Sequence, residues 1–192
     1  MERKLSRKEI THDRIVEAAA RAIRRGGYDG IGVADIMKEA GLTHGGFYAH
    51  FESRGALLAE AVERAGRDSA GRLERSVEAG RQKGASALRA LVESYLSESH
   101  LFSAEAGCPV AALGSEMARQ PPAVRAASAD RVQALIRLVR QTLPATAAPS
   151  QAVLIASAMV GALQLSRAMD DKRRAKAMLK SARVALLSQY DT

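Results

Sequence analysis

The stretch that decides the fold is AGLTHGGFYAHF, residues 40–51 of a 192-residue chain. Two adjacent glycines, Gly45 and Gly46, lie between Thr43 and a run of aromatic residues. Each glycine weakens a helix by about 1 kcal/mol relative to alanine, yet the spacing of the aromatic residues is helical. Such a helix needs a reason other than helix propensity for the small residues in its first turn.

Helical geometry sorts this stretch into an inner and an outer face. With 3.6 residues per turn, Phe47 and Phe51 share one face, and we expect them to anchor the segment in a core. Gly45 and Ala49 fall nearly opposite, so the outer face is small and lets the backbone approach another molecule closely. A smooth helix with polar side chains on its flanks fits the major groove of DNA.

The polar residues around this face form the predicted DNA contact set. Free amides and the helix dipole favour phosphate at the start of the helix, and phosphates line the walls of the groove. The residues expected to lead into the groove are Thr43, His44 and Gly45, with Gly46 beside them. Those expected to hold the phosphate backbone are Tyr48, His50 and Arg54.

Two helical segments are expected before this stretch. Ser6 and Glu9 have the spacing of a capping box, which predicts a helix that ends at the glycine pair 26–27. A second, short helix is predicted over about residues 33–40, and Gly41 can adopt the left-handed conformation that turns the chain. Together with the helix after Thr43, they predict a helix-turn-helix domain of three helices over residues 1–53.

The rest of the chain, residues 54–192, is predicted to be a larger helical domain without strands. Ser53 is expected to cap a long helix over about residues 54–81. Prolines and the segment PATAAPS mark the boundaries of the later helices. These are expected at about residues 85–101, 108–119, 122–143, 150–170 and 172–188. The predicted fold class is therefore all-α.

Composition limits the class of protein more weakly. The single cysteine, Cys108, excludes an intrachain disulfide and suits a reducing cytoplasm. The N-terminus lacks the apolar region of a signal peptide, and the apolar stretch 152–163 is shorter than the roughly 20 residues of a membrane span, so no membrane partner is expected. The net charge of +8 permits a polyanion partner without requiring one.

The string AGLTHGGFYAHFESRGALL, residues 40–58, resembles the signature of the TetR family of transcriptional repressors. The resemblance is strong over about residues 10–60, and the remainder is similar in helical layout and length. Two residues depart from the pattern: Gly46 replaces a frequent Thr, with loss of one hydroxyl, and Met37 stands where a small Ala is usual. The resemblance implies a repressor that binds a palindromic operator as a homodimer and uses the contact residues given above.

The resemblance also implies that the last two helices, about residues 150–188, pair with those of a second chain. The segment AVLIASAMVGALQLSRAM, residues 152–169, is apolar on nearly all sides, which predicts a helix that is buried all round. A core helix within one chain is the alternative. Candidate contacts for a small-molecule effector are the larger or polar groups among aliphatic ones, each of which can equally be core or surface: Tyr95, His100, Phe102, Met117 and Gln164.

Cys108 is a further candidate, as a sensor. It precedes Pro109 at a predicted helix start, where the helix dipole favours the reactive thiolate. Some TetR-like repressors carry a cysteine near this point and respond to electrophiles or oxidants. The alternative is a small buried hydrophobic residue.

Other classes of function are disfavoured. The sequence has no phosphate-binding loop, no zinc-protease motif and no nucleophile elbow, so no enzyme and no cofactor are expected. His44 and His50 are not spaced as metal ligands, so no metal is expected. A DNA-binding architectural protein that needs no ligand stays open as the alternative to a ligand-released repressor.

Overall fold

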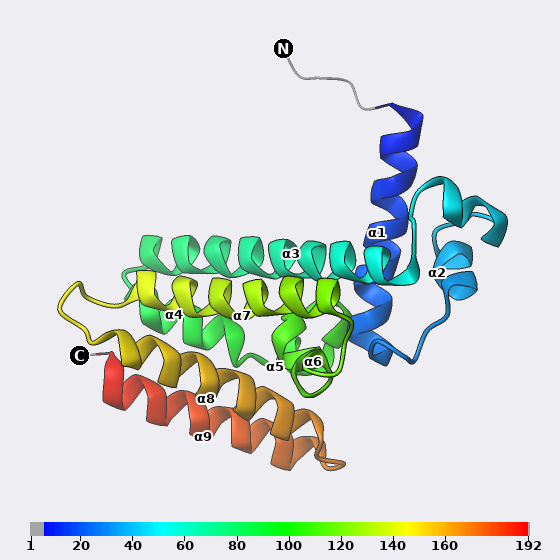
Figure 1. Cartoon of the computed structure of the whole chain (residues 1–192). Helices are drawn as coiled ribbons and strands as arrows, with labels where there is room; N and C mark the ends of the chain where they lie inside the picture. Colours follow the sequence, from blue (N-terminus) through cyan, green and yellow to red (C-terminus); the bar gives the residue numbers. More distant parts are fainter. Residues whose placement is uncertain (1–5, 192) are drawn as a thin grey trace.

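The computed structural model describes residues 6–191, and every regular element in that range is a helix. In chain order these are α1 (Arg7–Gly26), α2 (Val33–Glu39), η1 (His44–Ala49), α3 (Arg54–Gln82), α4 (Ala87–Tyr95), α5 (Glu98–Phe102), η2 (Ala104–Ala106), α6 (Pro109–Met117), α7 (Pro122–Thr142), α8 (Pro149–Arg167) and α9 (Lys172–Tyr190). The first three form a head at one end of a larger helical body (Figure 1). The all-α prediction is confirmed.

Local signals set the helix ends in the head. The Ser6 hydroxyl accepts from the Glu9 amide at 3.2 Å, and the Glu9 carboxylate accepts from the Ser6 amide at 2.7 Å, so the predicted capping box is present. Gly27 and Gly41 take positive φ angles of 79° and 69°, which end α1 and turn the chain after α2. Ser53 caps α3 as predicted. These four signals are readable because each acts within a few residues.

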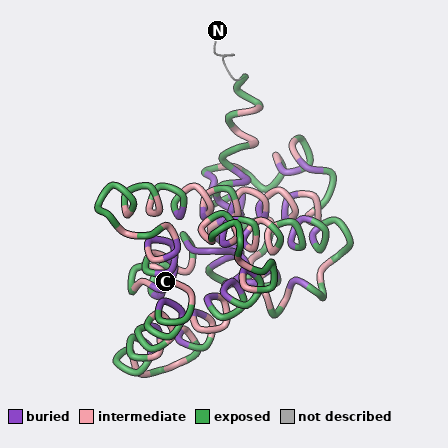
Figure 2. Tube along the Cα trace, turned by 90° about the vertical axis from the view of Figure 1, so that its left-hand side faces the viewer, coloured by how far each residue is buried: buried purple, intermediate pink, exposed green. Residues whose placement is uncertain are grey.

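Helix α3 joins the head to the body. It packs against α1 on one side and against α4 and α7 on the other. Its first turns bury Leu57, Leu58 and Val62, each of which contributes about 1.5–3 kcal/mol. The start of α1 is exposed and its later turns are buried, as Figure 2 shows. The head is therefore fixed to the body through the second half of α1 and the first half of α3.

Two helix predictions were wrong in detail. The helix expected over residues 85–101 is broken at Leu96, because the Ser97 hydroxyl accepts from the His100 amide at 3.2 Å and starts α5. The segment after Thr43 is a 3-10 helix, η1, and the Thr43 side chain makes no capping hydrogen bond. Six residues with two glycines are too few to propagate an α-helix, and packing holds the tighter turn instead.

Helix α8 is only half-buried within one chain, whereas the sequence predicted burial all round. Its inner face, with Ile155, Met159 and Leu163, is inaccessible to solvent. Its outer face carries three exposed apolar side chains, Val153, Leu154 and Leu165. The helix is apolar on both sides, as predicted, but no other element within residues 6–191 packs against its outer side.

The same helix bears on the membrane expectation. That expectation rested on the stretch 152–163, but α8 continues to 19 residues and is long and apolar enough to cross a membrane by length and composition alone. It is the single such helix within residues 6–191. A core or interface helix passes the same test, so the finding is weak evidence for a span.

Candidate nucleic-acid interface and effector pocket

Two aromatic side chains anchor η1, as predicted. Phe47 and Phe51 are 2% and 3% exposed, and their rings stack with centroids 5.6 Å apart. The imidazole of His12, from α1, also stacks on Phe51, with ring centroids 4.5 Å apart. Aromatic pairs in this geometry add about 0.5–1.5 kcal/mol beyond their buried area. Phe51, just after η1, is therefore held against α1, while η1 itself packs against α2.

The outer face of η1 is smooth and open. A Cβ added to Gly45 would meet no heavy atom within 4 Å, and the φ angle of Gly45 is not positive. Nothing within residues 6–191 therefore requires glycine at this position. Thr43, His44 and Ala49 are exposed beside it, and Tyr48 is 75% exposed. The small outer face fits the close approach of a second molecule.

Gly46 and Met37, the two residues that depart from the TetR pattern, are neighbours in the structure. Met37 is fully buried, and its terminal methyl would lie 3.7 Å from a Cβ at Gly46, which is an ordinary contact. Met37 thus packs against η1 without a steric clash.

His50 and Tyr48, on the flanks of η1, differ in their exposure to solvent and in their surroundings. The Nδ1 atom of His50 is buried and has no hydrogen-bond partner among residues 6–191. Burial, followed by the charges of His12 and Lys8, lowers the pKa of His50. His12 itself contacts the Glu60 carboxylate at 2.6 Å. A neutral His50 offers one hydrogen bond to a phosphate but little charge. Tyr48, whose hydroxyl has no partner in the described part of the chain, is the more open of the two.

Arg54 already has an intramolecular role. Its guanidinium donates to the backbone carbonyl of Tyr28 and lies 3.8 Å from the Asp29 carboxylate. The structure thus ties the start of α3 to the loop after α1. The predicted contact between Arg54 and phosphate stays a prediction, and it requires the side chain to serve two partners or exchange one for the other.

Tyr28, which the sequence analysis missed, joins the head to the body. It is fully buried, its amide donates to the Glu116 carboxylate of α6 at 2.9 Å, and its hydroxyl lies 3.1 Å from the Ser128 hydroxyl of α7. A single tyrosine after a glycine pair carries no sequence signal for this role, because both partners lie far along the chain.

Arg24 makes a second connection. This buried side chain donates to the Ala20 carbonyl at 2.8 Å and to the Gly107 carbonyl, just before α6, at 3.0 Å. Burial, with a contribution from the nearby charge of Arg72, lowers the pKa of Arg24 to about 10, so the guanidinium stays charged at neutral pH. The last turn of α1 is therefore bonded directly to the segment that leads into α6.

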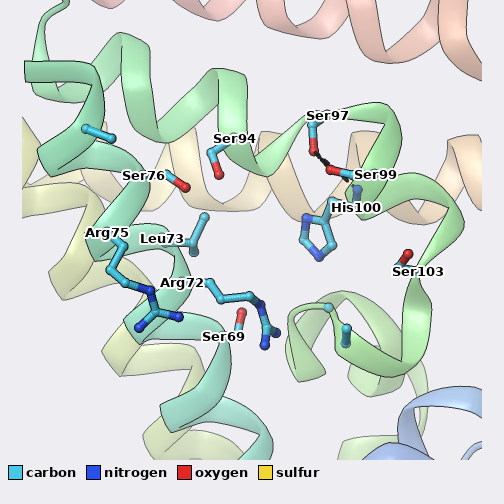
Figure 3. Close-up of a pocket in the computed structure, with 13 residues that line it drawn as sticks. Ser69, Arg72, Leu73, Arg75, Ser76, Ser94, Ser97, Ser99, His100 and Ser103 are labelled. Atoms are coloured by element: carbon cyan, nitrogen blue, oxygen red, sulfur yellow. Dashed lines mark hydrogen bonds between the residues drawn. The ribbon is translucent and has the colours of Figure 1, made fainter. Parts of the chain in front are cut away.

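A cavity of about 480 Å³ lies in the body, between α3 on one side and α4, α5 and η2 on the other. Arg72 and Arg75 project from α3, and His100 faces them from α5 (Figure 3). Six serines share the lining: Ser69, Ser76, Ser94, Ser97, Ser99 and Ser103. The volume is within the usual range for small-molecule sites, but the lining is more polar than most.

Of the five predicted effector contacts, only His100 lines this cavity. Tyr95 is fully buried, and its hydroxyl lies close to the Cys108 side chain. Phe102 is 52% exposed on the outside, beneath the ammonium groups of Lys172 and Lys176. The other two lie elsewhere on α6 and α8, namely the buried Met117 and the half-buried Gln164.

His100 is held by the backbone on both sides. Its Nδ1 lies 2.7 Å from the Tyr95 carbonyl and its Nε2 lies 2.9 Å from the Cys108 amide. Since a carbonyl only accepts and an amide only donates, the proton is on Nδ1. Burial is the main cause that lowers the pKa of His100 to about 4. His100 is thus a neutral strut between the end of α4 and the start of α6.

Cys108 lies at the start of α6, as predicted, but its side chain is only 4% exposed. It lines a small second cavity of about 30 Å³, next to Pro109 and Leu135. Contact with an electrophile therefore requires local opening of α6. Its role as a sensor stays a prediction.

Comparisons with known proteins bear on both parts of the chain. The model of the family "Bacterial regulatory proteins, tetR family" matches residues 15–61, and that of "Transcriptional regulator LmrA/YxaF-like, C-terminal domain" matches residues 84–180. An uncharacterized HTH-type transcriptional regulator of Mycobacterium tuberculosis H37Rv, Rv0196, is 32% identical over 170 residues, which cover 83% of this chain and 85% of that protein.

Solved structures share the fold. A TetR-family regulator from Cytophaga hutchinsonii has a TM-score of 0.77 at 19% identity, over 98% of both chains. One from Chloroflexus aurantiacus has a TM-score of 0.76 at 23% identity, over 97% of this chain and 98% of that one. The reduced form of Escherichia coli NemR has a TM-score of 0.75 at 21% identity, over 93% and 96%.

Proposed function

This chain belongs to the TetR family of bacterial regulatory proteins, and from that premise we propose that it represses transcription as a homodimer on a palindromic operator, released by a small molecule. Family membership makes the chain a DNA-binding transcriptional regulator and not an enzyme, as the sequence predicted. The operator, the dimer and the release by an effector are the proposed parts. DNA binding also implies that the protein works in the cytoplasm.

The observation that carries the DNA-reading proposal is the open outer face of η1. Within the part of the chain that the structure describes, Gly45 has no steric or conformational reason to be glycine, and Tyr48 projects beside it into solvent. Close approach of the η1 backbone to base edges supplies that reason. We assign the groove contacts to Thr43, His44 and Gly45, with Tyr48 on the phosphates. Residues 1–53 then form the reading domain and residues 54–192 the regulatory domain.

The outer faces of α8 and α9 support the homodimer. Leu154 and Leu165 are 57% and 60% exposed, and Val184 of α9 is exposed as well. Gly161 lies on α8 with nothing within 4 Å of an added Cβ, so a second helix can pack closely there. Two copies of this apolar face would cover each other, and a two-fold dimer matches a palindromic site.

Selection of bound DNA from a random pool tests the proposal. We expect wild-type protein to enrich a palindrome, and the His44→Ala variant to enrich a site with altered bases in each half. Enrichment of no sequence at all would instead indicate an architectural DNA-binding protein, and the repressor proposal would fail.

A further inference from the structure

Two arginines in the 480 Å³ cavity lack partners. Arg72 and Arg75 lie three residues apart, on one face of α3, and neither makes a hydrogen bond or ion pair within residues 6–191. Earlier on the same helix, Arg64 pairs with Asp68 at 3.0 Å and Arg67 with Glu63 at 3.6 Å. The helix thus neutralises its arginines before the cavity and leaves two unpaired within it.

Among residues 6–191, no acidic side chain lines the cavity to balance these charges. By contrast, a neighbouring cavity that includes Arg81 of the same helix is also lined by Glu74 and Glu78. The electrostatic potential of the larger cavity is therefore positive, and its walls concentrate that potential. A site of this kind favours an anion.

Serine hydroxyls supply the rest of the lining. The Ser97 and Ser99 hydroxyls lie 2.9 Å apart on the wall opposite α3, as Figure 3 shows. Four other hydroxyls have no hydrogen-bond partner in the described part of the chain: those of Ser69, Ser76, Ser94 and Ser103. They are free to bond a polar ligand. His100 is not, because the backbone occupies both of its ring nitrogens.

We propose that this cavity binds a small anionic molecule, with a phosphate or carboxylate group paired to Arg72 and Arg75 and hydroxyl groups facing the serines. This inference rests on the proposed function, since it gives the chemical class of the effector. The planar guanidinium of arginine suits such oxyanions because it donates two parallel hydrogen bonds. The site is separate from the DNA surface, since Arg72 lies about 27 Å along α3 from Arg54 at 1.5 Å per residue.

The cavity is connected to the head through the hydrogen bond between Gly107 and Arg24. Gly107 lines the cavity, and its carbonyl accepts from Arg24 at the end of α1. A Cβ at Gly107 would lie 2.7 Å from the His100 ring, so α5 and the start of α6 are packed too closely to move separately. An anion bound to Arg72 would therefore lie in the same cavity as the Gly107 segment that holds the end of α1.

Calorimetric titration of the purified full-length protein tests the proposal at fixed ionic strength. The probes are 3-phosphoglycerate, glucose 6-phosphate and citrate, with neutral glucose as the comparison. The test variant is Arg72→Gln with Arg75→Gln, and the matched control is Arg81→Gln on the same helix. We expect at least one anionic probe to bind wild type and the control alike, the double variant to bind it at least tenfold more weakly, and glucose not to bind.

Two outcomes overturn the proposal: no anionic probe binds, or the double variant binds as tightly as wild type. Circular dichroism and operator binding without a probe are measured on each variant. If the variants are folded and bind operator while no anion binds, the anion proposal fails and the repressor proposal stands. If no protein in the series enriches or binds an operator, the repressor proposal fails, whatever the result with the anionic probes.

Discussion

The DNA-reading head and the effector cavity are built in opposite ways. In the head, the residues that face outward and those that anchor them follow each other in the chain, from Thr43 to Phe51. The cavity draws its lining from α3, from α4 and α5, and from the segment before α6. The head is a local motif, and we propose that it contacts DNA with small side chains. The cavity is a tertiary assembly, and we propose that it contacts an anion with charge. Substitutions in one should therefore leave the function of the other intact.

The largest expected effect comes from the proposed dimer face of α8, because the paired heads depend on it. Leu154→Glu with Leu165→Glu places charges on the exposed side of α8, where we propose the second chain packs. The dimer should dissociate, and operator affinity should fall roughly 100-fold or more, because each head alone reads half a site. Light scattering and a gel-shift series measure the two effects.

The control for this variant is Ser150→Glu, an exposed position at the start of the same helix. If the double variant remains a dimer, α8 does not form the dimer interface. Met159 is unsuitable for the test, because it is fully buried in its own chain and a charge there would unfold the protein.

The next effect is specific to the cavity side. The pKa of His100 is lowered to about 4 from an unfolded value of 6.5, so the unfolded chain binds the proton more tightly. This group therefore stabilises the fold fully above pH 6.5, and that contribution is lost as the pH falls toward 4. The loss is about 3 kcal/mol at most. Urea unfolding at pH 7 and pH 4.5 should show a steeper loss in wild type than in His100→Asn.

The exposed His44 of the head gives the matched control for this pH effect. The variant His44→Asn should lose stability between the two pH values as wild type does. Equal pH dependence in wild type and His100→Asn would show that His100 is not the neutral strut described.

A smaller effect is expected at the head. Tyr48→Phe removes one exposed hydroxyl from the flank of η1 and should weaken binding to all DNA sequences by roughly tenfold, with unchanged affinity for any cavity ligand. Fluorescence anisotropy with operator and with random DNA measures it. Tyr190→Phe, at the far end of α9, is the control. If the variant changes its base preference and does not lose affinity uniformly, Tyr48 contacts the bases and not the phosphates.

The smallest effect concerns the junction of the two regions. Tyr28→Phe deletes the hydrogen bond to Ser128 and should lower the free energy of unfolding by about 1 kcal/mol. The effect is limited because the Ser128 hydroxyl keeps its bond to the Val124 carbonyl at 2.8 Å. Denaturant unfolding measures it. If stability does not change, the hydroxyl of Tyr28 adds nothing to the junction beyond packing.

The contrast explains what could be predicted from the sequence. The spacing of Phe47 and Phe51, the glycines at 27 and 41 and the cap at Ser53 each act over a few residues, and all were found in the structure. The break at Leu96 was missed because Ser97 caps a helix of only five residues, too short to show a periodic pattern.

The cavity could not be predicted, for a different reason. The face of α3 with Arg72 and Arg75 has the same polar spacing as any solvated helix face, and only the fold places serines from α4 and α5 opposite it. Phe102 was proposed as a ligand contact and lies outside, because the break at Leu96 starts a new helix, α5, whose last residue, Phe102, lies beneath Lys172 and Lys176. Tyr28 and Arg24 depend on partners about 80 to 100 residues away.

Hydroxyl-radical footprinting of the full-length protein on its selected operator tests most directly the claim that η1 reads DNA from a two-fold dimer. The predicted result is protection of the backbone sugars that flank two successive major grooves on one face of the duplex, with centres about 34–36 Å apart. The variant Leu154→Glu with Leu165→Glu should lose that paired protection. A single protected groove with wild-type protein, or uniform protection along the duplex, would contradict the claim.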